Sequence, residues 1–456
     1  MSRQDSERRL QDAVQALKLY GELKSENGGD VSALLAAAAE GMERLLGEAR
    51  GAPEDPELHA AEPNDLPGIR EARPSGPRGV DIDPGQYEDR LAGAFLGRSA
   101  GCILGSPVEG WSVDRMRAWA DEDGTAFPPQ DYWKSVAEPS KLRYRTIPRR
   151  NYARDRMDGI PVDDDLQYTL LGLLILEDSG PGFTTEDVAR AWQTYLPFAC
   201  TAEDVALTNL RRGIPALQAA DPDGVAPAAQ SCFMSEDREH ASAGPVANPY
   251  YQWIGADIRA DPWGYVAPGR LELAAELAQR DAYLSHRRNG IYGAMYFAAA
   301  IAAAFAVDDP VEALRLALTE IPEGSRLARE LRWAMETAPQ IRDYRDANAA
   351  VTERFPTMHH VHTINNACLT VFGIHIGGRN LSRVISETVA MGYDNDCTAA
   401  TAGSIVGAVI GRQGLEPHWT APFGNTIHSY LKGYRRFSIR DVLDRFEAQM
   451  RRVIAG

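Results

Sequence analysis

Two stretches of this chain carry a small residue at every fourth position. The first series is Gly93, Gly97, Gly101 and Gly105, and the second is Ala399, Gly403, Gly407 and Gly411. Residues four apart lie on the same face of a helix, so each series produces a shallow groove. Because glycine costs a helix roughly 1 kcal/mol relative to alanine, such a face makes sense only where another helix packs very close. We predict a buried, central pair of helices.

The chain from Tyr87 onward has the apolar periodicity of helices, and strand-like alternation is scarce. The clearest helical stretches are 163–178, 185–197, 270–283, 289–307, 310–319, 324–337, 380–391 and 397–411. We therefore predict an all-α fold, with one large orthogonal helical domain over residues 87–456.

Residues 1–50 are predicted to form a helical extension, because apolar residues recur at helical intervals on both sides of Asn27-Gly28-Gly29. These residues are Leu10, Val14, Leu17, Leu23, Leu34, Leu35, Met42, Leu45 and Leu46. Residues 51–86 are rich in Pro, Gly, Glu and Arg, which is typical of a linker or a poorly ordered segment. The extension either mediates self-association or partner docking, or packs on the main domain, and its sequence does not decide between these roles.

The formal net charge of −16 argues against a nucleic-acid or anionic-membrane partner, since both require a basic face. The five cysteines form no CxxC pair, which fits a reducing compartment. The first residues lack the apolar core of a signal peptide. The longest apolar run, 293–307, is shorter than the roughly 20 residues that span a bilayer, and it predicts a buried helix. We expect a cytoplasmic protein.

Three consecutive aspartates, Asp163, Asp164 and Asp165, precede a leucine-rich helical stretch. One or two carboxylates at a helix start are explained by capping and by the helix dipole. A third adjacent charge is repelled by the others, and a bound hard cation would relieve that repulsion.

Asp394 and Asp396 lie at the start of the second small-residue helix. If that helix is buried, its carboxylates need partners, and a metal ion is an economical one. The Asp-x-Asp pattern resembles the start of a calcium loop, but no Glu completes the 12-residue loop. Glu109 follows the first small-residue helix in a turn bounded by Pro and Gly, where a solvated loop residue is the ordinary interpretation.

Taken together and in this order, the three stretches resemble the ADP-ribosylglycohydrolase family over about residues 87–435, with motifs about 55 and 230 residues apart. The resemblance implies that family's helical fold and a binuclear site for two Mg²⁺ ions, with Mn²⁺ as the other option. The implied metal ligands are Glu109, Asp163, Asp164, Asp165, Asp394 and Asp396. Asp163 stands where the family usually has Thr or Ser, and Cys397 stands where many members have Thr.

The resemblance implies hydrolysis of a ribosyl glycosidic bond, with Glu109, Asp164 and Asp396 as catalytic residues. The implied substrate is an ADP-ribosylated protein side chain or a small ADP-ribose conjugate. Substrate contacts are expected from Gly255, Ala256 and Arg259 in a glycine-containing loop, and from His362.

Two alternatives stay open. One is a hydrolase or lyase of another N- or O-ribosyl metabolite that lacks ADP, and the other is a catalytically silent relative that binds ADP-ribose. His359, His360 and His362 could also suggest a metal site, although capping and hydrogen bonding are the simpler explanation beside six carboxylates.

Overall fold

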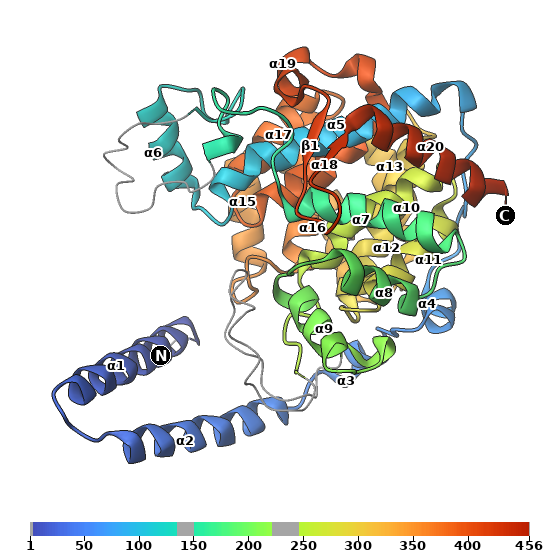
Figure 1. Cartoon of the computed structure of the whole chain (residues 1–456). Helices are drawn as coiled ribbons and strands as arrows, with labels where there is room; N and C mark the ends of the chain where they lie inside the picture. Colours follow the sequence, from blue (N-terminus) through green and yellow to red (C-terminus); the bar gives the residue numbers. More distant parts are fainter. Residues whose placement is uncertain (1–2, 135–149, 221–245, 456) are drawn as a thin grey trace. The chain divides into compact units, whose positions relative to one another are not determined.

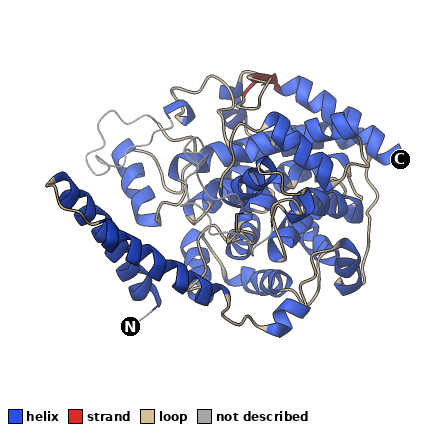
Figure 2. Cartoon of the chain, turned by 60° about the horizontal axis from the view of Figure 1, so that its bottom comes forward, coloured by secondary structure: helices blue, strands red, loops and turns tan. Residues whose placement is uncertain are grey.

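The computed structural model describes residues 3–134, 150–220 and 246–455. The chain divides into two compact units, Met1–Ala60 with Phe355–Met358 and Ala61–Arg354 with His359–Gly456. Helices make up nearly all of the regular structure in the described residues, and one small sheet accompanies them (Figure 2). The predicted all-α fold is confirmed.

The first unit contains α1 (Arg3–Glu26), α2 (Ser32–Arg50) and α3 (Pro56–Ala60). Gly28 turns the chain after α1 with a positive φ of 78°, a conformation that glycine adopts at little cost. Oδ1 of Asp30 then accepts a hydrogen bond from the backbone N–H of Ser32 at 2.9 Å, at the start of α2. The described part of this extension, residues 3–50, thus forms two helices joined by a short turn.

The second unit begins at Ala61 rather than at Tyr87, because part of the expected linker is fixed by polar anchors. Glu62 is buried and accepts hydrogen bonds from Arg288 at 2.7 Å and from Asn289 at 2.9 Å. Arg73 forms a 2.6 Å ion pair with the buried Glu320. Polar anchors of this kind produce no apolar periodicity, so the sequence pattern does not reveal them. They hold α4 (Leu66–Ala72) in this unit.

The remaining elements of the second unit follow in chain order. They are α5 (Tyr87–Gly105), α6 (Val113–Asp123), α7 (Asp164–Ser179), α8 (Thr185–Tyr195), α9 (Thr201–Arg211), α10 (Asp261–Val266), α11 (Leu271–Ala282), α12 (Asn289–Ala304), α13 (Pro310–Ala317), α14 (Arg326–Thr337), α15 (Tyr344–Arg354), α16 (Thr363–Gly377), α17 (Leu381–Ala390), α18 (Asn395–Ile410), α19 (Pro417–Thr420), β1 (Thr426–His428), β2 (Arg436–Ser438) and α20 (Ile439–Ala455). The two strands pair antiparallel, with Ile427 opposite Phe437.

Helices α5 and α18 form the close central pair that the small residues predict (Figure 1). A Cβ atom added to Gly97 would lie 2.3 Å from the carbonyl oxygen of Gly403, and one added to Gly101 would lie 2.1 Å from that of Ala399. Any side chain at these positions would push the two backbones apart. The pair is therefore possible only with the small residues that the sequence provides.

The alanine-rich helix α12 is buried along its whole length, as predicted for the apolar run that it contains. Among the described residues, no helix is both long enough and apolar enough to cross a membrane.

Candidate active site

A pocket of about 520 Å³ opens in the second unit, where the ends of α5, α7 and α18 meet. We call it the acidic pocket, because seven carboxylate residues line it. These are Glu109, Asp163, Asp164, Asp165, Glu203, Asp394 and Asp396. All six metal ligands expected from the sequence are in this set.

Local structure explains how the aspartates reach the pocket. Asp163 is the N-cap of α7, and its Oδ1 accepts a hydrogen bond from the backbone N–H of Asp165 at 3.2 Å. The preceding segment is fixed by Ile160, whose N–H donates to the carbonyl oxygen of Thr426 in β1 at 2.8 Å. Asp394 occupies the N-cap position of α18 without capping it through its side chain, so its carboxylate is available to the pocket.

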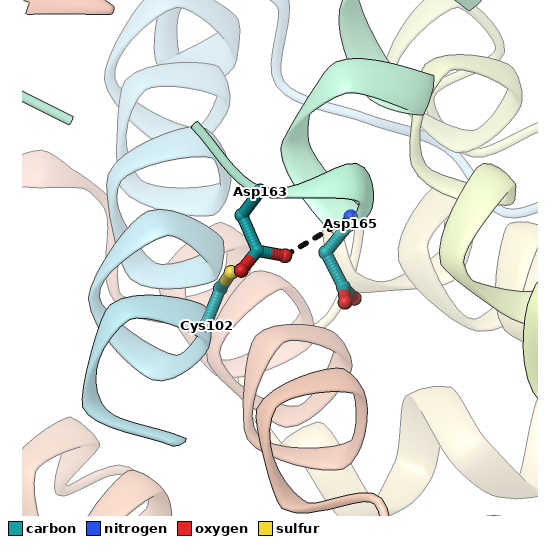
Figure 3. Close-up of side chains that lie close together, drawn as sticks. All are labelled: Cys102, Asp163 and Asp165. Carbon is teal, nitrogen blue, oxygen red and sulfur yellow. Dashed lines mark hydrogen bonds between the residues drawn. The ribbon is translucent and has the colours of Figure 1, made fainter. Parts of the chain in front are cut away.

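The close helix pair carries the aspartates of α18 to the end of α5. A Cβ atom on Gly105, the last residue of α5, would lie 2.4 Å from the Cα of Asp396. The chain continues from Gly105 through a short 3₁₀ turn to Glu109, whose side chain is exposed at the rim. Figure 3 shows how Asp163 and Asp165, at the start of α7, face Cys102 on α5.

The potential ligand atoms form three overlapping groups, in each of which all the atoms lie within 4.8 Å of one another. The groups are Glu109 with Asp394 and Asp396; Asp165 with Asp396 and Cys397; and Cys102 with Asp163 and Asp165. Because Asp396 and Asp165 are shared, the three groups form one continuous row of donors across the pocket.

Burial makes the charged form of these carboxylates unfavourable. Asp165 is 1% exposed, and Asp394 and Asp396 are each 3% exposed. Burial first, and then the neighbouring charge of Asp396, raise the pKa values of Asp165 and Asp394 well above the ordinary value. The Oδ1 atom of Asp394 has no hydrogen-bond partner among the described residues. Oxygen donors in this state fit a hard divalent cation.

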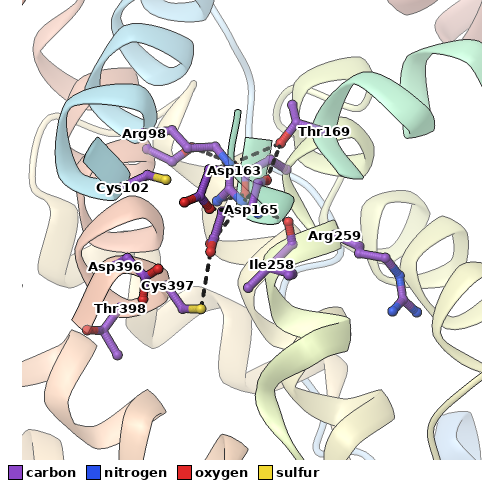
Figure 4. A network of polar contacts seen from close by, with 12 residues as sticks. Arg98, Cys102, Asp163, Asp165, Thr169, Ile258, Arg259, Asp396, Cys397 and Thr398 are labelled. Atoms are coloured by element: carbon purple, nitrogen blue, oxygen red, sulfur yellow. Dashed lines mark hydrogen bonds and ion pairs between the residues drawn. The ribbon is translucent and has the colours of Figure 1, made fainter. Parts of the chain in front are cut away.

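One buried guanidinium, that of Arg98, lies beside the row of carboxylates (Figure 4). Arg98 is fully buried and forms a 2.6 Å ion pair with Asp261. Its Nη2 donates to the backbone oxygen of Asp165 at 2.6 Å and lies 3.4 Å from the Oδ1 of that residue. Burial alone would lower the pKa of Arg98, but Asp261 and Asp165 raise it. Arg98 therefore stays charged and joins α5 to the first turn of α7.

Cys397 behaves as a neutral hydrogen-bond donor in this arrangement. Its Sγ donates to Oδ2 of Asp165 at 3.2 Å. Burial, reinforced by the charges of Asp165 and Asp394, raises the pKa of the thiol well above its ordinary value. Since a thiol binds magnesium poorly, the cysteine at this position is better suited to orienting Asp165 than to ligating a cation.

The expected substrate loop is placed differently from its prediction. Gly255 lines the pocket, but Ala256 and Arg259 do not. Arg259 is 2% exposed and forms ion pairs with Glu203 at 2.5 Å and with Asp281 at 2.7 Å. The guanidinium is thus paired inside the protein, because the two buried carboxylates need a positive charge beside them.

His362 lies at the N-cap of α16 and does not line the pocket. Its Nδ1 accepts a hydrogen bond from the backbone N–H of Ile364 at 3.2 Å. The neighbouring His360 lines the pocket instead, beside His359, which stacks on Trp253 with ring centroids 4.1 Å apart. In the structure His362 thus caps a helix and His359 stacks on an aromatic ring, while His360 lies in the pocket wall.

Tyr168 and Glu203 are among the pocket residues that the sequence analysis missed. Tyr168 is 3% exposed, and its hydroxyl has no hydrogen-bond partner among the described residues. It follows Asp164 by four residues on α7, and that spacing was a usable signal. Glu203 lies against the backbone of Gly255, where an added Cβ would be 2.2 Å from its Oε1. Its pairing with Arg259, 56 residues away, leaves no trace in the sequence.

No lysine or arginine is found among the described residues that line the pocket. The described part of the wall is thus acidic and aromatic, with Phe198 and Tyr430 in tilted ring contact at 4.7 Å. A cation is the chemical complement of such a wall.

The chain was also compared with known proteins. A family model for ADP-ribosylglycohydrolase matches residues 83–452. A solved structure of an "ADP-ribosylglycohydrolase-related protein complex" is similar at 18% sequence identity, over 81% of this chain and 99% of that chain, with a TM-score of 0.48. No curated protein matches the sequence.

Proposed function

This chain belongs to the ADP-ribosylglycohydrolase family of glycosidases, and we propose that it hydrolyses the bond between ADP-ribose and a protein side chain or small conjugated group with the help of two divalent cations. The observation that carries the proposal is the row of buried carboxylates in the acidic pocket. Five of the seven lining carboxylates are nearly inaccessible to water, and of these Glu203 is paired with Arg259, which leaves Asp163, Asp165, Asp394 and Asp396. Arg98 alone cannot neutralise them.

The donor set fits Mg²⁺, with Mn²⁺ as the second choice, because both bind carboxylate oxygens. In the proposed site, Glu109, Asp394 and Asp396 hold one ion. Asp163, Asp164 and Asp165 hold the second, together with the shared Asp396. The partnerless Oδ1 of Asp394 supports the first of these positions.

Divalent cations at such a site supply Lewis acidity and make a nearby water molecule easier to deprotonate. The residues of the chain do the rest. Glu109 is exposed at the rim and can accept the proton of the attacking water and deliver it to the leaving group as the bond to the anomeric carbon breaks. Asp164, which is partly exposed, and Asp396 face the ribose side. Their charge stabilises the positive charge that develops at the anomeric carbon.

The test is ADP-ribose release from mono-ADP-ribosylated arginine, serine and guanidine, with Mg²⁺ and then with EDTA. We expect Mg²⁺-dependent release from at least one substrate, and its loss in the Asp394→Ala and Asp396→Ala variants. Glu353→Ala removes an exposed carboxylate and serves as the matched control. Release that persists in EDTA and in both pocket variants would overturn the metal assignment.

A second candidate is a ribosyl compound without a diphosphate. It is favoured by the lack of lysine and arginine among the described lining residues and by the internal ion pairs of Arg259. Calorimetry with ADP-ribose and with a neutral nucleoside, both in Mg²⁺, separates the two candidates. Tighter binding of the nucleoside supports the second one. Binding of ADP-ribose without turnover of any conjugate would instead indicate a catalytically silent relative.

A further inference from the structure

The exposed large apolar side chains of the described chain are concentrated in one place. Eleven such side chains are at least 36% exposed, and ten of them belong to α1 and α2 of the first unit. The ten are Leu10, Val14, Leu19, Tyr20, Leu23, Leu34, Leu35, Met42, Leu45 and Leu46. In the described part of the second unit, only Leu217 is of this kind.

The apolar residues of the two helices follow the spacing of a coiled coil. In α2 and its N-cap, intervals of four and three residues alternate through Val31, Leu35, Ala38, Met42, Leu45 and Ala49. In α1, the same alternation links Leu10, Val14, Leu17 and Gly21. A repeat of 3.5 residues keeps one stripe facing a partner helix. We call these two stripes the apolar seam.

Within the first unit, α1 and α2 meet near their turn, where a Cβ atom added to Gly21 would lie 3.5 Å from Cδ2 of Leu35, and they leave the rest of the apolar seam open. Within the first unit, Leu10 and Val14 of α1 and Met42 of α2 line a common open groove. No residue of α2 is buried. Because helices in water gain most of their stability from packing of an apolar face, this hairpin requires a partner that fills the groove.

We propose that the partner is the hairpin of a second copy, so that two chains join in a four-helix bundle. The described surface of the second unit has only Leu217 to offer as an apolar counterpart, whereas a second hairpin offers ten such side chains. A two-fold interface also requires a surface that is complementary to itself. The apolar seam meets that requirement along both helices.

The charge of the two helices agrees with this assignment. Helix α1 has five basic and five acidic residues, and α2 has two and three, so the two helices together carry a net charge of −1 in a chain of −16.

The experiment is analytical ultracentrifugation of the full chain over a wide range of concentration. We expect a dimer of two 49.9 kDa chains. The Leu35→Glu/Met42→Glu variant should weaken the dimer by roughly a hundredfold or more, because it places charges in the centre of the interface. Leu217→Glu, the same type of change on the second unit, should leave the dimer intact. Near-UV circular dichroism checks that the second unit stays folded in each variant.

Two results would overturn the proposal. A monomer at every concentration would show that the apolar seam is covered within one chain or by another protein. A dimer that survives Leu35→Glu/Met42→Glu would place the contact elsewhere. Neither result depends on catalysis, so the proposal stands or falls independently of the proposed function.

Discussion

Replacing Gly105 by alanine should damage the acidic pocket, whereas the same change at Gly93 should not. Both glycines face α18 from opposite ends of α5. The new Cβ would lie 2.4 Å from the Cα of Asp396 in the first variant and 2.2 Å from the carbonyl oxygen of Gly407 in the second. Ordinary contact begins at 3.4 Å, so the helices must separate by about 1 Å in either case.

The two variants should therefore be destabilised alike. Overpacking of this kind costs typically about 1–3 kcal/mol, and the better helix propensity of alanine offsets up to about 1 kcal/mol of it. Only Gly105→Ala displaces a proposed metal ligand. A displacement of about 1 Å can lower a catalytic rate about a hundredfold, and metal binding depends on the positions of the ligands in the same way. We therefore expect a loss of Mn²⁺ affinity of at least about tenfold in Gly105→Ala and little loss in Gly93→Ala.

Calorimetric titration with Mn²⁺ and thermal unfolding in EDTA provide the two readouts. The comparison is informative because the second readout shows whether both variants are folded and equally weakened. Equal Mn²⁺ affinities in two folded variants would refute the idea that the glycine contact sets the position of Asp396.

Three further predictions concern single side chains. Arg98→Met leaves Asp165 and Asp261 without their buried cation and should cost about 3–5 kcal/mol of unfolding free energy in urea; a cost below about 1 kcal/mol would contradict its role. The Tyr168 hydroxyl has no hydrogen-bond partner among the described residues, so we expect it to contact the substrate. Tyr168→Phe should change the free energy of unfolding by no more than about 0.5 kcal/mol but raise the KM for the substrate. An unchanged KM would exclude a contact between this hydroxyl and the substrate. Burial lowers the pKa of His362 to about 3, and the positive charges of Arg326 and His359 add to the effect. As the pH falls, the histidine of the unfolded chain therefore takes up a proton near pH 6.5, whereas that of the folded chain does not. The folded state loses stability as the pH falls through this window. His362→Asn keeps a capping oxygen and should remove about 1–2 kcal/mol of the loss between pH 7.5 and pH 5 in urea unfolding; an unchanged pH dependence would show that His362 does not titrate in this way.

Much of the fold could be predicted from the sequence because its strongest signals are local. The four-residue spacing of small residues is sufficient to identify α5 and α18 as a close pair, and the family match over residues 83–452 confirms the resemblance seen in the motifs. The charges at the starts of α7 and α18 are equally visible. Each of these features depends on residues within a few turns of one another.

The rest of the site depends on pairings over long distances, which periodicity does not reveal. Arg259 was expected at the substrate and instead pairs with Glu203 and Asp281. Likewise, the segment from Ala61 onward lacks an apolar pattern because Glu62 and Arg73 fix it through hydrogen bonds and ion pairs. Such buried polar pairs form only when the tertiary structure brings the two residues together, so no local sequence pattern marks them.

The proposed ligands also have a consequence for the durability of the folded chain. Glu109, Asp164 and Asp394 belong to three segments separated by 55 and 230 residues. Cations held jointly by these segments would join distant parts of the chain, and because they bind the folded chain and not the unfolded one, they would stabilise it by mass action as their concentration rises. Metal supply would then govern not only turnover but also the lifetime of the enzyme against proteases.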